Sequence, residues 1–149
     1  MTRAPAPAER IVRRRIAAAI GLAAVVGTGL CVHAFLADSA GTDIVGDALY
    51  ALAAYLAVII VAPRLSAPAI GAIAAAWCVA VELFQLTGLP NTLAAFPPAM
   101  LVLGTVFDPR DLLVYVLTVI AVAGVDTAWR GTRSKSEAVR PEGDSLQHP

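Results

Sequence analysis

Residues 70–86 read IGAIAAAWCVAVELFQL and carry a single charged side chain, Glu82, followed one helical turn later by Gln85. A run of about 20 apolar residues is enough for a helix to cross the hydrocarbon core of a bilayer. A carboxylate at that depth costs a few kcal/mol, so it normally faces the protein interior and has a partner there. The segment therefore predicts a membrane-spanning helix with a polar site around Glu82.

The composition of the whole chain agrees with this prediction. Apolar residues make up 58% of the 149 positions and charged residues only 15%, whereas soluble domains are nearer ~50% and ~25%. Four segments are long and apolar enough to span: Ile16–Phe35, Ile44–Ala62, Ile70–Leu86 and Leu112–Trp129. We therefore expect an all-α, integral membrane four-helix bundle. The absence of a basic face argues against a nucleic-acid partner and leaves the lipid bilayer as the expected one.

The distribution of charge predicts the topology. Of the eleven lysines and arginines, nine lie near the two ends of the chain. Arg64 lies between the second and third spans, and Arg110 lies between the third and fourth. By the positive-inside rule, both termini and the Arg64 connection are cytoplasmic, and Arg110 is outside. A secretory signal peptide is the alternative for the first span, but its uncharged stretch exceeds the ~7–15 residues of such a peptide.

The membrane domain is expected to cover residues 10–130, between tails at 1–9 and 131–149 that are predicted to be disordered and cytoplasmic. Small residues four positions apart, such as Gly71 and Ala75, favour close helix packing in lipid. Between the third and fourth spans, the apolar stretch Leu89–Val106 is interrupted by three prolines. We expect a re-entrant or interfacial segment there, with its backbone satisfied by protein or water.

Polar side chains fall in the outer half of every predicted span. The candidate ligand-binding residues are Asp47, Tyr50, Glu82, Gln85, Asp108, Arg110, Asp111 and Tyr115. Several have a structural alternative. The run Asp108–Asp111 (DPRD) is typical of a helix start with an N-cap and a proline at the first position. Glu82 lies near the negative end of its helix. It either forms a structural hydrogen bond, pairs with a cation or has a direct role in function.

Other polar residues also have a structural explanation for their position. Thr42 or Asp43 can cap the second span, and Asp126 can pair with Arg130 four residues later. The chain contains no phosphate-binding loop, zinc motif, nucleophile elbow or dinucleotide fingerprint. We therefore predict no catalytic residues, no metal ligands and no cofactor.

Three blocks of sequence carry a family resemblance: GDALY at 46–50, VELFQ at 81–85 and LGTVFDPRDLLVY at 103–115. In this order they resemble the domain-of-unknown-function family 2809, small multi-pass membrane proteins of bacteria, itself similar to VanZ-like proteins. The resemblance implies a four-helix membrane domain with functional positions at Asp47, Tyr50, Glu82, Gln85, Asp108, Asp111 and Tyr115. Pro109 and Thr118 depart from the family, which usually has an aromatic and often a glycine there.

The leading hypothesis is a protein of the bacterial plasma membrane and cell envelope that binds or shields a lipid-linked or amphipathic ligand through an outer-leaflet pocket. Two alternatives are a metal-assisted enzyme acting on a lipid-linked phosphate and a small proton-coupled transporter that uses Glu82. A non-enzymatic role is favoured, because no nucleophile–base pair is present. Homo-oligomers are compatible with all three hypotheses.

Overall fold

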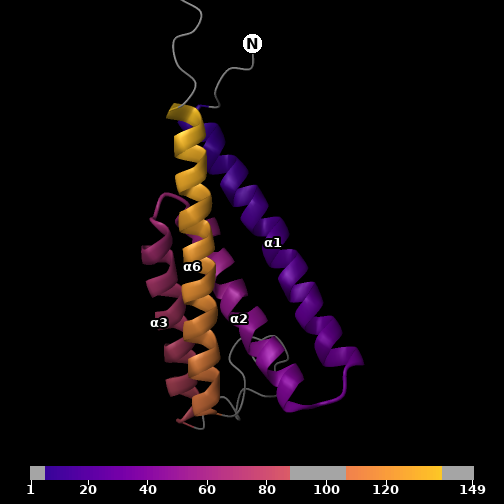
Figure 1. Cartoon of the computed structure of the whole chain (residues 1–149). Coiled ribbons are helices and arrows are strands. Elements are labelled where there is room, and N and C mark those ends of the chain that lie inside the picture. The colour runs from indigo at the N-terminus through magenta and orange to yellow at the C-terminus, as the bar shows by residue number, and fades with distance from the viewer. Residues whose placement is uncertain (1–5, 88–106, 139–149) are drawn as a thin grey trace, which may run out of the picture.

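The computed structural model describes residues 6–87 and 107–138. Within these residues there are four helices and no strand: α1 (Pro7–Phe35), α2 (Ala40–Val61), α3 (Ala67–Gln85) and α6 (Pro109–Ala138). Successive helices run in opposite directions, so that α1 begins and α6 ends at the same end of the bundle (Figure 1). The all-α, four-helix prediction is confirmed. The predicted proline-broken segment lies outside the described residues.

All four helices are long and apolar enough to cross a membrane. Large apolar side chains, among them Ile20 and Leu117, project outward with more than half of their surface exposed. In water such surfaces would have to be covered, whereas lipid tails solvate them without cost. The fold is therefore that of a membrane-embedded protein.

The helices are longer than the predicted spans, because apolarity marks the part of a helix that lies in lipid and not where the helix ends. Helix α6 continues past Arg130 to Ala138, and α1 begins at Pro7. The predicted cap of α2 is wrong. Ser39 is the N-cap, and its Oγ accepts the Thr42 N–H at 3.2 Å while the Thr42 hydroxyl accepts the Ser39 N–H at 2.9 Å. Since α2 starts earlier than expected, Thr42 is the third helical residue of a capping box.

Helix α2 is the centre of the bundle and packs against each of the other three helices. Helices α3 and α6 also pack against each other, and Gly71 lies at one of their contacts. A Cβ atom at that position would lie 3.3 Å from both Ala123 Cβ and Val119 Cγ1, so only glycine allows this approach without a shift of its neighbours. The packing role predicted for Gly71 is confirmed. The buried core consists mainly of Ala51, Tyr55, Ile59, Ile70, Ala74, Cys78, Tyr115 and Val119.

At the end where α6 finishes, which we call the arginine end, Asp126 joins the helices through its carboxylate. Its Oδ2 accepts hydrogen bonds from Arg14 Nη2, Tyr55 OH and Arg130 Nη2, each at 3.0 Å, and its Oδ1 accepts from Arg130 Nε at 3.0 Å. The two arginines also donate to the Leu65 carbonyl, between α2 and α3. The predicted Asp126–Arg130 pair is confirmed, and it belongs to a network that includes α1 and α2.

The Asp126→Asn variant should lower the free energy of unfolding by about 2 kcal/mol, measured by denaturant unfolding in mixed micelles. The loss follows from two guanidinium groups losing their counter-ion, and partial solvent exposure keeps it below the value for a fully buried pair. Thr127→Val is the matched control, because that hydroxyl bonds only the Ala123 carbonyl, and a change within ~0.5 kcal/mol is expected. Equal effects of both variants would contradict a stabilising role for the network.

Candidate functional site

At the opposite end of the bundle, α1 and α3 finish while α2 and α6 begin. We call this the acidic end. Among the described residues, the carboxylates at this end are Asp38, Asp43, Asp47, Glu82, Asp108 and Asp111, accompanied by one arginine, Arg110. Residues 88–106 contain no charged side chain and therefore do not change the net charge of this part of the sequence. The acidic end therefore carries a large excess of carboxyl groups over cations.

Glu82 is the most deeply buried of these acids, with 0% of its surface exposed. It is placed on α3 so that the hydroxyl of Tyr115, on α6, donates a hydrogen bond to Oε1 at 3.1 Å. The backbone N–H of Asp108 faces the same carboxylate, but Oε2 has no partner at hydrogen-bond geometry. Gln85 lies one turn later and is also buried. Glu82 is thus tied to α6 through one oxygen only.

Asp47, on α2, and Asp111, in the first turn of α6, interact electrostatically with each other. Two neighbouring carboxylates away from bulk water repel each other strongly, so this arrangement is costly when both are ionised. Asp47 Oδ2 and Asp111 Oδ1 are buried and make no hydrogen bond. The sequence alone could not show that Asp47 and Asp111 are neighbours, because they lie on different helices.

The guanidinium group of Arg110 lies among three aspartates without forming a short hydrogen bond to any of their side chains. Its Nη2 is 3.8 Å from Asp43 Oδ2 and from Asp108 Oδ2, and its Nε is 3.8 Å from Asp111 Oδ1. These are ion pairs at longer range than hydrogen bonds. Asp108 is also the N-cap of α6, since its Oδ1 accepts the Arg110 backbone N–H at 2.8 Å. The predicted helix start at Asp108 is confirmed.

The two predicted tyrosines form an aromatic layer between the acids and the apolar core. The rings of Tyr50 and Tyr115 pack with centroids 5.8 Å apart at an angle of 50°. The Tyr50 hydroxyl accepts a hydrogen bond from Trp77 Nε1 at 3.0 Å. Tyr50 therefore links α2 to α3, while Tyr115 links α6 to Glu82.

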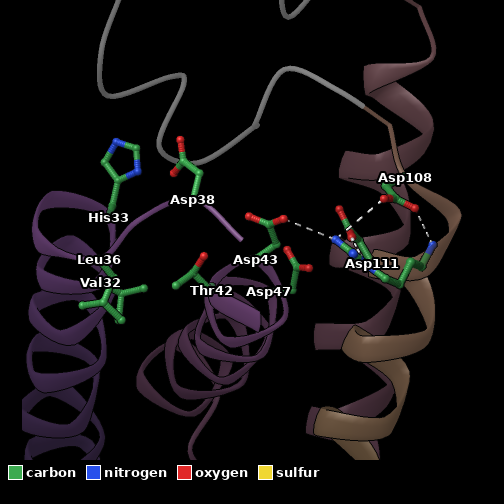
Figure 2. Close-up of a pocket in the computed structure, with 11 residues that line it drawn as sticks. Val32, His33, Leu36, Asp38, Thr42, Asp43, Asp47, Asp108 and Asp111 are labelled. Carbon is green, nitrogen blue, oxygen red and sulfur yellow. Dashed lines mark hydrogen bonds and ion pairs between the residues drawn. The ribbon is translucent and has the colours of Figure 1, made fainter. Parts of the chain in front are cut away.

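A cavity of about 390 Å³ opens in front of the acids, as Figure 2 shows from its lining residues. Asp43 and Asp47 on α2 lie beside Asp108 and Asp111 on one side of it, while α1 and its C-cap supply the apolar Val32 and Leu36 on the other side. The complete lining is Val32, His33, Leu36, Asp38, Thr42, Asp43, Gly46, Asp47, Asp108, Arg110 and Asp111. The wall is thus acidic on the side of α2 and α6, while on the side of α1 it presents Val32 and Leu36 together with His33 and Asp38.

Four of the eight predicted site residues line this cavity: Asp47, Asp108, Arg110 and Asp111. Tyr50, Glu82, Gln85 and Tyr115 are not in its wall. Val32, His33, Leu36 and Asp43 line the cavity but are not among the predicted site residues. Asp38 and Asp43 could have indicated this part of the site, because the short connection between α1 and α2 keeps both residues near the same membrane surface.

A family model described as "Protein of unknown function (DUF2809)" matches residues 36–119, more than half of the chain. The chain belongs to the DUF2809 family. The match includes α2, α3 and the beginning of α6, and therefore nearly all of the acidic end. Neither the curated proteins nor the solved structures contain a match. The fold and site of this DUF2809 protein must therefore be interpreted from its own geometry.

In the part of the chain that the structure describes, no group of three or more His, Cys, Asp or Glu side chains is arranged to hold a metal ion. The set Asp47, Glu82, Asp108 and Asp111, considered from the sequence as ligands of a divalent cation, is included in that finding. What the arrangement offers instead is a group of hydrogen-bond acceptors.

Replacing Tyr115 by Phe in this DUF2809 protein should lower the free energy of unfolding by about 1–2 kcal/mol, because a buried carboxylate oxygen loses its donor. In a Glu82→Leu background the same replacement should cost little, since no acceptor is left. A double-mutant cycle in detergent should give a coupling energy on the order of 1 kcal/mol. Equal losses in both backgrounds would mean that the Tyr115–Glu82 bond contributes nothing.

Proposed function

We propose that this protein resides in the bacterial plasma membrane, with both termini cytoplasmic, and binds or shields an amphipathic or lipid-linked ligand of the cell envelope through the acidic-end cavity. The observation that carries the proposal is the mixed wall of that cavity. Val32 and Leu36 offer an apolar side, while Asp47 and Asp111 offer acceptors. An amphipathic molecule needs both kinds of surface at one place.

The placement of the cavity in the outer leaflet is supported by the charges at the two ends. Of the nine lysines and arginines among residues 6–87 and 107–138, only Arg110 belongs to the acidic end. The positive-inside rule then favours the arginine end as cytoplasmic. Since α1 begins and α6 ends there, both termini would be cytoplasmic. The cavity would open to the outer leaflet and the cell envelope.

Binding is favoured over the two alternatives by particular features of the described residues. A metal-assisted enzyme would need a convergent ligand set, which the acids do not form. A proton carrier would need a polar route from Glu82 to the opposite end, where Asp126 lies. Apolar core residues, including Ile70, Ala74 and Val119, occupy the space between these two acids. A role related to that of VanZ-like envelope proteins is compatible with ligand binding.

The topology can be tested with single cysteines in a Cys31→Ala/Cys78→Ala background. Asp38→Cys, at the acidic end, should react with a membrane-impermeant maleimide in intact cells. Thr132→Cys, at the arginine end, should react only after permeabilisation. Both positions are exposed, so accessibility within the protein does not limit the reaction. Labelling of Thr132→Cys alone in intact cells would reverse the proposed orientation.

Ligand binding can be tested without assuming the identity of the ligand. A photo-reactive benzoylphenylalanine at Leu36, which lines the cavity, should crosslink in cells to a distinct amphiphile identified by mass spectrometry. Leu117 is the matched control, because it is similarly exposed (57% against 53%) but lies outside the cavity wall. The same bulk lipids in the same proportions at both positions would contradict the proposed function.

A further inference from the structure

We propose that the arginine end binds the headgroup of an anionic phospholipid through Arg15, on α1, and Arg64, in the turn between α2 and α3. This site is separate from the acidic-end cavity and does not depend on the proposed function. Three observations carry the inference: the two arginines lack counter-ions, they lie at the depth of lipid headgroups, and exposed apolar side chains adjoin them.

The arginines at this end differ in whether the protein itself neutralises their charge. Arg14 and Arg130 share the carboxylate of Asp126 as their counter-ion. Arg15 and Arg64 are exposed, and neither forms an ion pair with any residue that the structure describes. Asp126 already accepts four hydrogen bonds. The guanidinium groups of Arg15 and Arg64 are therefore available to an anion from outside the protein.

The end of α2 brings these two arginines to the same place. Arg15 Nη2 donates to the Val61 carbonyl at 3.4 Å. Arg64 follows Val61 by three residues, in a tight turn closed by the bond from the Leu65 N–H to the Ala62 carbonyl at 3.2 Å. Three residues span at most about 11 Å even when extended. Both guanidinium groups are thus near the same helix end, and each can donate charge-assisted hydrogen bonds to phosphate oxygens.

The turn between α2 and α3 lies at the depth of lipid headgroups. It joins the ends of two helices that are each long and apolar enough to cross a membrane, so it lies at a membrane surface. Helices α1 and α6 continue beyond the turn (Figure 1). Arg15 is at the same depth as the turn, because it contacts the Val61 carbonyl. Basic groups between membrane helices at this depth are suited to lipid headgroups.

Exposed apolar side chains adjoin the two arginines on the side of the bilayer core. Val61, whose carbonyl accepts the bond from Arg15, has 78% of its surface exposed, and Ile16, the next residue of α1, has 54%. Ile20 continues this surface one helical turn deeper. A soluble anion gains nothing from apolar surface, whereas a phospholipid carries acyl chains directly beside its phosphate. The combination therefore favours a lipid over a free phosphate.

The charge of the site favours an anionic lipid over a zwitterionic one. In phosphatidylcholine an ammonium group balances the phosphate, and two guanidinium groups would repel that ammonium. Phosphatidylglycerol has no such cation. Since no acid among the described residues pairs with Arg15 or Arg64, a headgroup with net negative charge completes the charge balance.

Lipid selectivity is the first test. The full-length protein in detergent would be titrated with phosphatidylglycerol and with phosphatidylcholine and analysed by native mass spectrometry. We expect phosphatidylglycerol to be retained at least about fivefold better, which corresponds to about 1 kcal/mol. A large molar excess of inorganic phosphate should not displace it. Equal retention of the two lipids would overturn the proposal, and displacement by phosphate would do so by indicating a site for free anions.

Two variants test whether these arginines are responsible. Arg15→Gln and Arg64→Gln should each lower the retention of phosphatidylglycerol about fivefold. Arg64 makes no hydrogen bond or ion pair with any described residue, so its variant should unfold at the wild-type temperature. Arg13→Gln is the matched control. Arg13 is also exposed and lacks an ion pair among the described residues, but residues two apart on a helix do not share a face.

The control separates a built site from general attraction between a basic surface and anionic lipids. Retention by Arg13→Gln should stay within about twofold of the wild type. Equal losses in all three variants would overturn the proposal, because any basic residue would then serve. Unchanged retention in either Arg15→Gln or Arg64→Gln would also overturn it, since the site requires both arginines. None of these outcomes affects the proposed function, whose crosslinking test concerns the opposite end of the bundle.

Discussion

A carboxylate within apolar surroundings must find donors, and the arrangement of this bundle follows from how its acids meet that requirement. At the arginine end, Asp126 accepts four hydrogen bonds from Arg14, Tyr55 and Arg130. Because those donors come from three helices, satisfying one acid also fixes α1, α2 and α6 relative to one another. The apolar core then occupies the space between this network and the acidic end.

The two ends of the bundle satisfy their acids to different degrees. Asp126 uses both oxygens, whereas Glu82 uses one and leaves Oε2 without a partner. Asp47 and Asp111 likewise keep buried oxygens without hydrogen bonds. Full satisfaction is what a structural network requires. The acidic end leaves some of its buried carboxyl oxygens without donors, and in this it differs from the arginine end.

The family match and the cavity do not cover the same part of the chain. DUF2809 matches residues 36–119, which include the acidic-end carboxyl groups of α2, α3 and α6 but no residue of α1, which ends at Phe35. The arginine-end residues Arg14 and Asp126 are also outside the match. The acids that line the cavity are therefore within the matched region, while Val32 and His33 of α1 line it from outside that region.

The sequence by itself determined the helices and the general location of the polar residues. Four apolar segments can satisfy their backbone hydrogen bonds in lipid only as helices, and the DPRD run specifies a helix start through local bonding at Asp108. Both features depend on residues close in sequence. The same applies to the Asp126–Arg130 pair, which is one helical turn long.

Only the tertiary structure decided which polar residues meet. Tyr115 with Glu82, Asp47 with Asp111, and Arg14 with Asp126 each join different helices. Their contact depends on how each helix is rotated and how deeply it is placed. That rotation is set by packing such as the close approach at Gly71, which a linear pattern does not encode. Span prediction therefore found the polar end, but helix packing selected the lining of the cavity.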